Sequence, residues 1–467
     1  NKMRPDTVAN KAVRHLGTVE DGDVFAEYRV AQAFTLTDGV LTNDSLQMSA
    51  GFSVRAINAQ ARGLAHSAQF SHKRLDEAFK DATAQVYDTQ ASGKHDLDAV
   101  HGRRQHTLYR ADNPLDSVPD SEKIRLLQNI DAYVREQNAN VTQVNATLSM
   151  AWQAIQIIRT DGTRLADIRP MVKLGIMPVL NNKFEGIGSM GGRFDVSRIL
   201  DESTWQSVCD NALEQAGYLS QARDIEGGEM PVVLNNGWCG VLIHEAVGHA
   251  LEADSVRTGG SVYKDYFGEK VASDLVTIVD DGAIDETRGA LNLDDEGTPT
   301  GKNVLIRNGY IERFMNDRQS ARLMDAQPTG NGRRESYQDH VLTRMTSTYM
   351  AAGNDNPQDM IRDIEHGIYA DSFGGGSVNT PTGAFNFESN LAWRIENGRL
   401  VEPVKGAVLT GDVRSALQGV TMVGNDCALD DGGGTCGKNG QGAPVNVGQP
   451  SVRIERGIKV SGAGGPA

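Results

Sequence analysis

The most constraining feature of the sequence is a pair of histidines within one apolar segment. Residues 240–254 contain the pattern His244-Glu245-x-x-x-His249, and the flanking side chains are apolar. This pattern predicts a buried helix over about residues 240–253. Imidazole nitrogens are good zinc ligands, and a glutamate beside one can take a proton from metal-bound water. The segment therefore indicates either a metal site or a pair of buried, hydrogen-bonded histidines.

The spacing of the two histidines constrains the helix itself. Five residues of a regular α-helix rotate by about 500°, which leaves the second imidazole about 140° away from the first. Both rings face one metal only if the helix carries a one-residue π-bulge, where hydrogen bonds run from i to i+5. Gly248, directly before His249, weakens the helix at this point. We therefore predict an irregular helix at Gly248.

A catalytic zinc site needs a third protein ligand in addition to the two histidines. Glu252 and Asp254 follow the second histidine closely, although both are equally typical of solvated acids at a helix end. Cys436 lies in a glycine-rich loop over residues 430–440, and a thiolate is a strong zinc ligand. An unpaired Glu245 in an apolar helix would cost free energy that a nearby metal offsets. Spacing alone leaves the third ligand open among these three residues.

The same glycine-rich loop resembles a nucleotide site. Residues 432–438 match most of a phosphate-binding loop, Gly-x-x-x-x-Gly-Lys. The next residue is Asn439, so the hydroxyl that would bind magnesium is missing, and the glycines and Pro444 that follow do not begin a helix. The pattern therefore does not predict an NTPase.

Composition limits the remaining classes of function. The chain carries a formal charge of −15, which disfavours a nucleic-acid partner because phosphate is bound mainly by lysine and arginine. Four cysteines in 467 residues do not form a disulfide framework. No apolar run approaches the roughly 18 residues of a membrane helix, and no signal peptide is visible. We expect a cytoplasmic protein with no membrane or nucleic-acid partner.

The order of predicted elements indicates an α+β fold of two domains. The chain is longer than a single core usually serves, and helices and strands mix without a regular βαβ rhythm. A polar stretch at 224–229 separates an N-terminal mixed α/β domain (1–224) from a C-terminal β-rich domain (225–467) that carries the metal-binding helix. Strands are predicted at 23–35, 51–57, 141–159, 164–180 and 230–234, with helices at 71–89, 121–137 (capped by Ser121) and 203–216.

Four blocks of sequence resemble the TldD/PmbA family, and specifically its TldD branch. The resemblance is dense from about residue 230 to the end and thinner before it. Ala250 and Ala253 stand where members of the family carry glycines, and the N-terminal region is shorter. The blocks are 241–254 (VLIHEAVGHALEAD), 293–306 (LDDEGTPTGKNVLI), 328–337 (PTGNGRRESY) and 422–450 (MVGNDCALDDGGGTCGKNGQGAPVNVGQP).

The resemblance implies a function, a ligand set and a partner. The family consists of metallopeptidases that act on peptides and small or unfolded proteins. Its pattern places one Zn²⁺ per chain on His244, His249 and Cys436, with Glu245 as the general base. A TldD chain typically pairs with a PmbA-type (TldE) paralogue that lacks the motif, so we expect a heterodimer of that kind or a homodimer.

The resemblance also implies that an unfolded peptide binds as an added strand in a tunnel between subunits. Backbone pairing of that kind reads little sequence, and glycines let another backbone approach closely. The alternative function is a non-catalytic interaction or regulatory subunit whose metal is structural, which would need a fourth protein ligand. The segment expected to bind the peptide is Phe373, Gly374, Gly375, Gly376, Ser377 and Val378.

Overall fold

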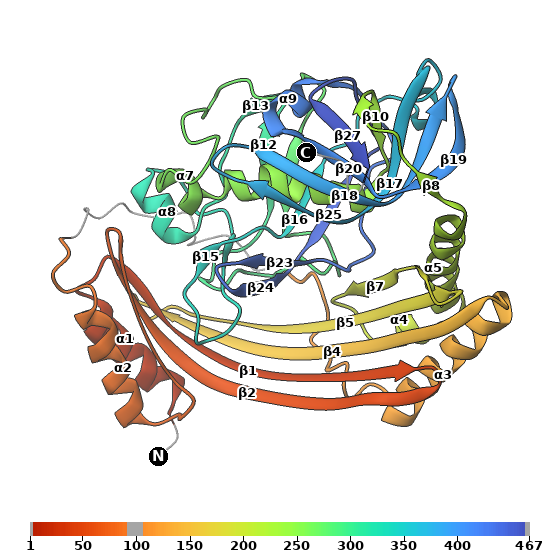
Figure 1. The fold of residues 1–467 in the computed structure, drawn as a ribbon. Helices are drawn as coiled ribbons and strands as arrows, with labels where there is room; N and C mark the ends of the chain where they lie inside the picture. Colours follow the sequence, from red (N-terminus) through yellow and green to blue (C-terminus); the bar gives the residue numbers. More distant parts are fainter. Residues whose placement is uncertain (1–2, 91–105, 463–467) are drawn as a thin grey trace.

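The chain folds around one long, curved sheet with smaller sheets and short helices stacked on its concave side (Figure 1). The computed structural model describes residues 3–90 and 106–462. Long antiparallel strands dominate the N-terminal part, whereas the C-terminal part combines short strands with helices of a few residues. The predicted α+β class is confirmed.

The first sheet is antiparallel and has the strand order β3-β2-β1-β4-β5-β6, with β7 also paired to β5. Val144, Ala146, Leu148 and Met150 alternate with less buried residues along β4, so one face of the sheet is apolar. The strands are β1 (Asp21–Thr37), β2 (Val40–Asn58), β3 (Ala61–Ser67), β4 (Val141–Arg159), β5 (Arg164–Leu180), β6 (Phe184–Glu185) and β7 (Gly188–Gly192).

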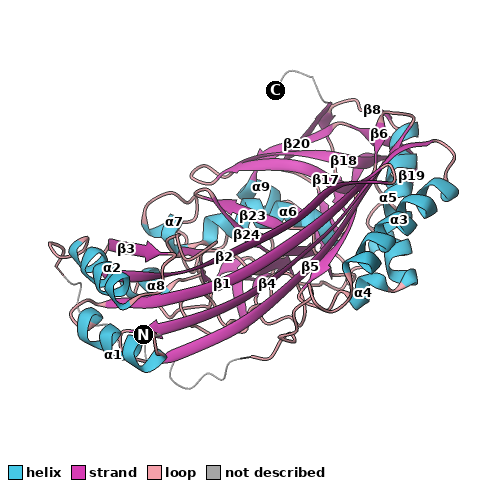
Figure 2. Ribbon diagram, turned by 90° about the horizontal axis from the view of Figure 1, so that it is seen from below, coloured by secondary structure: helices cyan, strands magenta, loops and turns pink. Residues whose placement is uncertain are grey.

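Helices cover the two ends of this sheet and leave its middle to the C-terminal part (Figure 2). At one end, α1 (Pro5–Leu16) and α2 (His72–Ala84) form a small core with β2. At the other end, α3 (Asp120–Gln137) and α5 (Glu202–Gln221), preceded by the short α4 (Ser197–Leu200), share a core with β4 and β5.

Several predicted boundaries are corrected by the structure. The strand predicted at 51–57 is only the buried half of β2, because residues 40–50 are largely exposed and lack the alternation that reveals a strand. The helix predicted at 71–89 ends at Ala84. Pro119, not Ser121, is the N-cap of α3, and no side chain caps that helix. Proline is tolerated there because the nitrogen of the N-cap residue takes no part in the hydrogen bonds of the helix.

The C-terminal part contains a ten-stranded and a six-stranded sheet. The larger has the order β21-β26-β10-β17-β18-β20-β27-β9, with β19 beside β18 and β8 beside β19. Its strands are β8 (Arg223–Asp224), β9 (Gly228–Glu229), β10 (Val232–Leu234), β17 (His366–Asn379), β18 (Ala384–Glu396), β19 (Arg399–Lys405), β20 (Ala407–Asp412), β21 (Val420–Val423), β26 (Val452–Ile454) and β27 (Ile458–Gly462).

The smaller sheet has the order β13-β12-β11-β16-β25-β22, and two separate hairpins accompany it. Its strands are β11 (Ile278–Asp281), β12 (Lys302–Arg307), β13 (Tyr310–Ile311), β16 (Ser347–Met350), β22 (Ala428–Leu429) and β25 (Asn446–Gln449). The hairpins pair β14 (Gly332–Arg333) with β15 (Leu342–Thr343) and β23 (Thr435–Lys438) with β24 (Gln441–Pro444). Short helices lie between these strands and include α7 (Ala253–Arg257), α8 (Arg318–Leu323) and α9 (Val413–Gln418).

The chain passes from the first sheet to the second directly after α5. Strands β8 and β9 already belong to the ten-stranded sheet, through β19 and β27 respectively. The domain boundary expected at residue 224 stays a prediction, and this crossing lies beside it.

Buried ion pairs join the first sheet to the C-terminal part. Asp21 of β1 accepts hydrogen bonds from Arg159 of β4 at 3.0 Å and from Arg318 of α8 at 2.8 Å. Arg55 of β2 donates to Glu296 at 2.6 Å. These residues are at most 7% exposed, so removing one partner would leave a buried charge uncompensated.

Candidate metal centre

The helix that carries the two histidines changes its winding between them. An α-helical turn, α6 (Val241–Ile243), continues into a π-helical turn over His244–Gly248 and then a 3-10 turn over His249–Leu251. The backbone N–H of His249 donates to the carbonyl of His244, which is the i to i+5 bond of a π-turn. The predicted irregularity at Gly248 is confirmed, and it turns both imidazoles toward one point.

Gly248 is required by a neighbour and not by an unusual backbone conformation. Its φ of −56° and ψ of −56° are ordinary helical values. A Cβ atom at this position would lie 2.0 Å from the Sδ atom of Met345, which is fully buried. The glycine therefore makes room for Met345 against the π-turn, a reason that differs from the helix-weakening effect predicted from sequence.

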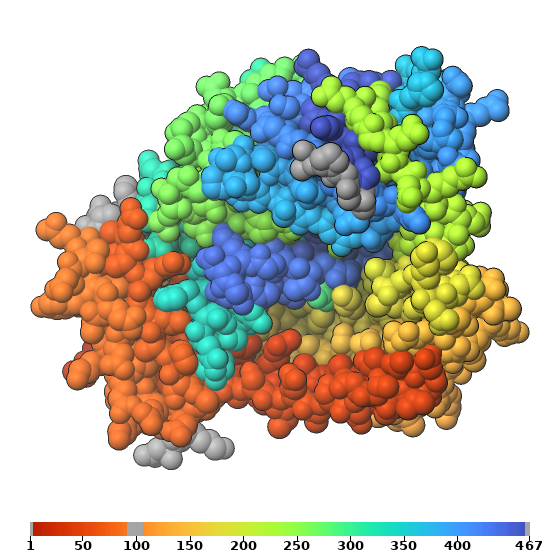
Figure 3. Space-filling model, in the orientation of Figure 1, coloured from red at the N-terminus to blue at the C-terminus, as the bar shows by residue number. Residues whose placement is uncertain are grey.

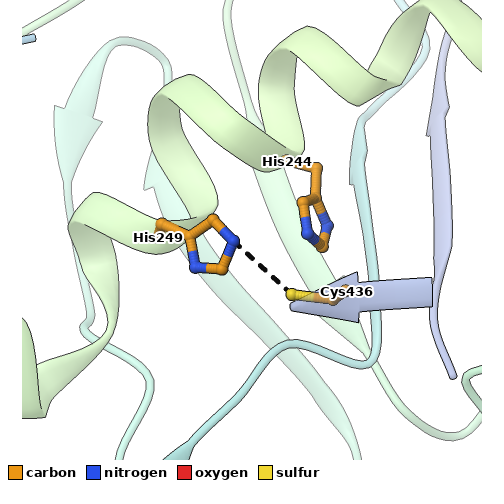
Figure 4. A group of neighbouring side chains, drawn as sticks. All are labelled: His244, His249 and Cys436. Carbon is orange, nitrogen blue, oxygen red and sulfur yellow. Dashed lines mark hydrogen bonds between the residues drawn. The ribbon is translucent and has the colours of Figure 1, made fainter. Parts of the chain in front are cut away.

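Three side chains converge at this turn (Figure 4). One donor atom each from His244, His249 and Cys436 lie within 4.8 Å of one another. The Nε2 atom of His249 is 3.4 Å from the Sγ atom of Cys436, and the two imidazole rings stand nearly perpendicular, at 85°. Two imidazoles and a thiolate form a donor set typical of a zinc-type metal.

Cys436 reaches this cluster from the hairpin of β23 and β24. The guanidinium of Arg344 donates to the carbonyl of Cys436 at 2.6 Å and to the carbonyl of Gln441 at 3.1 Å. Arg344 is 1% exposed, so it fixes both strands of the hairpin from within the core. The position of the thiol is therefore determined by a residue distant from the motif.

The electrostatics of the cluster favour the form of cysteine that binds metals. Burial raises the pKa of Cys436, but hydrogen bonds from His244 and His249 outweigh burial and lower the pKa to about 4. The thiolate is the ligating form of cysteine. Within the described part of the chain, the Nδ1 atom of His244 is buried with no hydrogen-bond partner. A bound metal ion would fit a cluster that holds a thiolate beside this buried imidazole.

Glu252 contacts His249 from the side away from Cys436, and Lys438 in turn contacts Glu252. The Nδ1 atom of His249 is 3.1 Å from a carboxylate oxygen of Glu252, which is fully buried. Burial lowers the pKa of His249, but Glu252 outweighs burial and raises it well above its ordinary value. Lys438 donates to Glu252 at 2.7 Å and to Asp254 at 2.7 Å. Neither carboxylate joins the three-residue cluster among the described residues.

Sequence reasoning considered Lys438 only as part of a false phosphate-binding loop. One signal could have revealed its position, because residues 436 and 438 are two apart on a strand and lie on the same face. Lys438 shares that face with Cys436, and Glu252 lies about one helical turn after His249. Together they predict an ion pair beside the cluster of His244, His249 and Cys436.

Glu245 lies at the solvent-accessible side of the cluster. One carboxylate oxygen is 3.6 Å from the Nε2 atom of His249, the ring nitrogen that faces Cys436. The side chain of Glu245 is 32% exposed, whereas that of Glu252 is 0% exposed. Of the two glutamates near His249, Glu245 is the one that water can reach.

The predicted peptide-binding segment lies in β17. One edge of β17 pairs with β18 along its whole length. Among the described strands, the other edge pairs only with β10, at Ile368–Ala370, so residues 374–378 have no strand on that edge. Residues 374–377 are exposed and Val378 is half-buried. A Cβ on Gly376 would collide with Phe387 of β18, whereas one on Gly375 would meet open space. The indole of Trp238, just before the histidine-bearing helix, donates to the carbonyl of Phe373 at 2.8 Å.

A hollow separates the first sheet from the C-terminal part (Figure 3). One cavity of about 580 Å³ has Trp238, Phe373 and Gly374 on one wall and residues of β4, β5 and α5 on the other. A second cavity of about 430 Å³ lies between the first sheet and the hairpin that carries Cys436. Both cavities are close to the elements that hold the cluster.

None of the helices in the described ranges combines the length and the apolar character required to span a membrane.

Comparison with known proteins relates this geometry to a family. Residues 113–218 match the family model described as PmbA/TldA metallopeptidase central domain, and residues 227–462 match its C-terminal domain. The chain is 39% identical over 451 residues to the metalloprotease TldD homolog of Haemophilus influenzae, covering 95% of this chain and 93% of the relative. It is 34% identical over 238 residues to the zinc metalloprotease TldD homolog of Saccharolobus solfataricus, covering 51% and 52%.

A solved structure has the same fold at low sequence identity. TldE from Thermococcus kodakarensis superposes with a TM-score of 0.74 and 18% identity, covering 97% of this chain and 100% of that one. The fold, the two family matches and a relative of 39% identity over almost the entire length agree with one another. This chain belongs to the PmbA/TldD family of metallopeptidases, in its TldD branch.

Proposed function

We propose that the chain is a zinc-dependent peptidase that hydrolyses unfolded peptides, with Zn²⁺ held by His244, His249 and Cys436. The observation that carries the proposal is the convergence of these three donors within 4.8 Å, beside a glutamate that water can reach. A metal bound there would polarise the peptide carbonyl and make the attacking water more acidic.

The residues of the chain supply the remaining parts of the reaction. Glu245 is close enough to the cluster to orient a water molecule, to accept its proton and to pass that proton to the departing amine. Glu252 fixes the imidazole of His249 by accepting at Nδ1, which leaves Nε2 for the metal. Lys438 compensates the buried charge of Glu252.

A catalytic role is favoured over a structural one by the number of ligands. A closed structural zinc site uses four protein ligands, whereas a catalytic site uses three and leaves one position for water. The cluster found among the described residues contains three donors. Glu252 and Asp254, the nearest acids considered as a fourth ligand, are held by Lys438 instead.

The substrate is proposed to bind as a strand along residues 374–378 of β17. The free edge of this segment would offer backbone hydrogen bonds, and these depend little on side-chain identity. A folded substrate could not pair in this way. The proposed substrates are therefore unfolded peptides or small proteins.

Replacing the proposed base tests the catalytic assignment. Glu245→Gln should retain zinc and bind peptide but hydrolyse it about 10²–10⁴-fold more slowly, because the water and the leaving amine lose their proton acceptor and donor. Glu226→Gln, at an exposed position outside the cluster, is the matched control. Zinc content, peptide binding and hydrolysis of an unfolded peptide are measured on the same samples. Unchanged turnover in Glu245→Gln would show that Glu245 is not the base.

We further propose that the chain pairs with another chain of the same fold, either a TldE-type paralogue or a second copy. Strand β3 covers the edge of β2 only at Phe52–Asn58, which leaves the rest of that edge without a strand among those described. Val40, Leu46 and Met48 on this edge are 64%, 61% and 69% exposed. Asp44 is the one charged residue among residues 40–51, and long exposed edges with few charges are normally protected in monomeric proteins.

The edge of β2 can be tested by adding charge. Leu46→Lys with Met48→Lys should abolish association, because lysines on an edge strand oppose strand pairing. Tyr87→Lys, which changes another strongly exposed apolar residue (85%), should leave association intact. Light scattering after size-exclusion chromatography, with and without the paralogue, gives the mass. A dimer that survives the double substitution would place the interface elsewhere.

A further inference from the structure

The cavity between the first sheet and the hairpin of Cys436 is lined by arginines. Its walls include six arginine side chains and two carboxylates, in a chain whose formal charge is −15. The positive lining is therefore a local feature that opposes the overall charge. The arginines are Arg29, Arg169, Arg193, Arg288, Arg333 and Arg334, and the carboxylates are Asp295 and Glu335.

The two carboxylates of the cavity are already engaged. Asp295 accepts from Arg169 at 2.6 Å and from the backbone N–H of Arg334 at 2.8 Å. Glu335 accepts from the backbone N–H of Gly442 in the hairpin at 2.6 Å. Arg334 in turn contacts Asp23 at 3.2 Å. Two arginines, Arg169 and Arg334, are thus compensated by carboxylates.

Three further arginines are buried without a carboxylate partner. Arg193, Arg288 and Arg333 are 4%, 8% and 4% exposed, and none forms an ion pair with an acid in the described part of the chain. Their hydrogen bonds go to neutral groups, such as the carbonyl of Pro170 for Arg193 and the carbonyl of Met345 for Arg333. The Nε atom of Arg193 is buried with no hydrogen-bond partner among the described residues, although its guanidinium lies 5.4 Å from the centre of the Tyr109 ring.

Burial opposes the charge of these three side chains. It lowers the pKa of Arg193, lowers the pKa of Arg288 to about 10 and lowers that of Arg333 to about 9. Charged groups inside proteins are ordinarily paired. Three guanidinium groups around a cavity of about 430 Å³ therefore lack the anion that would normally accompany them. Guanidinium groups match carboxylates especially well, since they donate two parallel hydrogen bonds.

The wall of this cavity is also part of the metal-binding hairpin. Thr435, Ala443 and Pro444 line it, and Cys436 pairs directly with Ala443. Arg288 donates to the carbonyl of Gly434 at 2.6 Å and to the hydroxyl of Thr435 at 2.9 Å. The arginines therefore contact residues that are one or two positions from Cys436 in the chain.

We propose that this cavity binds a carboxylate of the peptide substrate, with Arg193, Arg288 and Arg333 as its recognition residues. The proposal rests on the peptidase function proposed above and adds a preference for anionic peptides. The carboxylate can be the α-carboxylate of the peptide or the side chain of an aspartate or glutamate, because both present the same chemistry to a guanidinium.

Equilibrium binding of matched peptides tests the preference. Three fluorescent hexapeptides of alanine and glycine are compared, one amidated, one with a free C-terminal carboxylate, and one amidated but containing a single glutamate. Binding is measured on the zinc-loaded Glu245→Gln protein, with its partner subunit if it has one, so that no peptide is consumed. At least one carboxylate peptide should bind about tenfold or more tightly than the neutral one. The peptide that gains identifies the source of the carboxylate.

Substitutions assign the preference to the cavity. Arg193→Gln and Arg333→Gln should each reduce the tenfold difference to less than threefold and leave binding of the neutral peptide unchanged. Arg29→Gln serves as an exposed variant at the cavity wall that does not disturb the core, and it should weaken the preference partially. Arg198→Gln, which removes a surface arginine with a 45% exposed side chain, should have no effect.

Competition separates recognition from general screening. Acetate should displace the carboxylate peptide at concentrations where chloride of equal ionic strength does not, because only acetate competes for the guanidinium groups. Equal affinity of all three peptides, or a preference that survives Arg193→Gln and Arg333→Gln, would overturn the proposal. Hydrolysis of the amidated peptide by the unmodified protein is followed in parallel. Its absence would count against the peptidase function and leave the carboxylate site supported by binding.

Discussion

Glu252 and Lys438 orient His249 from the side of the ring that does not face the metal-binding cluster. The lysine also binds Asp254 and the carbonyl of Thr343, at 2.7 Å and 3.0 Å. This network joins the end of the histidine-bearing helix to the hairpin of Cys436. Such contacts fix the tautomer and direction of a ligating imidazole, and they commonly change metal affinity by about 10–100-fold.

Removing the thiol of Cys436 tests the proposed ligand set most directly. Cys436→Ala should lose most of its bound zinc while the fold survives, because two imidazoles alone do not complete a zinc site. Cys427→Ala removes an exposed thiol and should retain zinc. Zinc is measured by elemental analysis of protein purified without a chelator, with circular dichroism as the check on folding. Full zinc occupancy in Cys436→Ala would exclude Cys436 as a ligand.

At the residue level, the sequence predicts the candidate residues of the helix motif but not the side chains that surround them in the fold. The motif identified His244, Glu245 and His249, because they lie within one helix. Spacing alone could not choose among Cys436, Glu252 and Asp254, and only resemblance to the family pointed to the thiol. The roles of Arg344 and the cavity arginines depend on contacts across the fold, which leave no local pattern.

The proposed metal centre depends on the π-turn, and Met345 packs directly against this turn. The turn lets two histidines five residues apart face the same thiol. It is enclosed by a core that contains Ile243, Ala246 and Val247. A helix forced back to regular winding would separate the imidazoles by more than a third of a turn.

A methyl group at Gly248 should disturb both the packing and the metal centre. Gly248→Ala would place Cβ 2.0 Å from the Sδ atom of Met345, so we expect a loss of about 1–3 kcal/mol in the free energy of unfolding and weaker zinc binding. Gly217→Ala is the matched control, because a Cβ there meets no atom within 4 Å. It should be neutral or stabilise α5 by up to about 1 kcal/mol. Urea unfolding measures both, and a neutral Gly248→Ala would show that Met345 can move aside.

Elements were predicted best where the pattern of burial was regular. Strands β4 and β5 match the predicted ranges 141–159 and 164–180. Buried and less buried side chains alternate along each strand, and the turn at Asp161-Gly162 marks the end of one strand and the start of the next. The first half of β2 was missed, since residues 40–50 have no buried face to produce a pattern. The predicted end of α2 and the predicted N-cap of α3 were wrong, because the ends of a helix depend on its packing in the fold as well as on local sequence propensity.

At the scale of the whole molecule, a set of buried ion pairs fastens the first sheet to the C-terminal part. Burial raises the pKa of Asp21, but Arg318, Arg159 and Arg322 outweigh burial and hold it well below its ordinary range. A carboxylate with a lowered folded-state pKa contributes stability above its unfolded pKa, and this contribution is lost as the pH falls. The two parts should therefore be held together at neutral pH and weakened in acid.

Replacing this carboxylate tests the connection. Asp21→Asn should lower the free energy of unfolding by about 3–5 kcal/mol at pH 7, because it leaves buried arginines uncompensated. The difference from the unmodified protein should shrink below about pH 4, where the unfolded carboxylate takes up a proton. Asp6→Asn breaks an exposed pair with Arg164 and should cost at most about 1 kcal/mol. Urea unfolding at both pH values decides, and a pH-independent difference would contradict the assignment.

The cluster joins two parts of the chain that are far apart in sequence, since His249 and Cys436 are separated by 187 residues. A single ion bound to both acts as a cross-link that closes a loop of that length. The ion would bind the folded arrangement and not the unfolded chain, so it would stabilise the fold by mass action. Strands β23 and β24 have four residues each. Contacts of Arg344, Lys438 and Gln441 hold them to the rest of the fold. Zinc would then have a structural role in addition to its catalytic one, because it would link the histidine-bearing helix to the hairpin of Cys436. A chelator would remove this link and so loosen one wall of the arginine cavity.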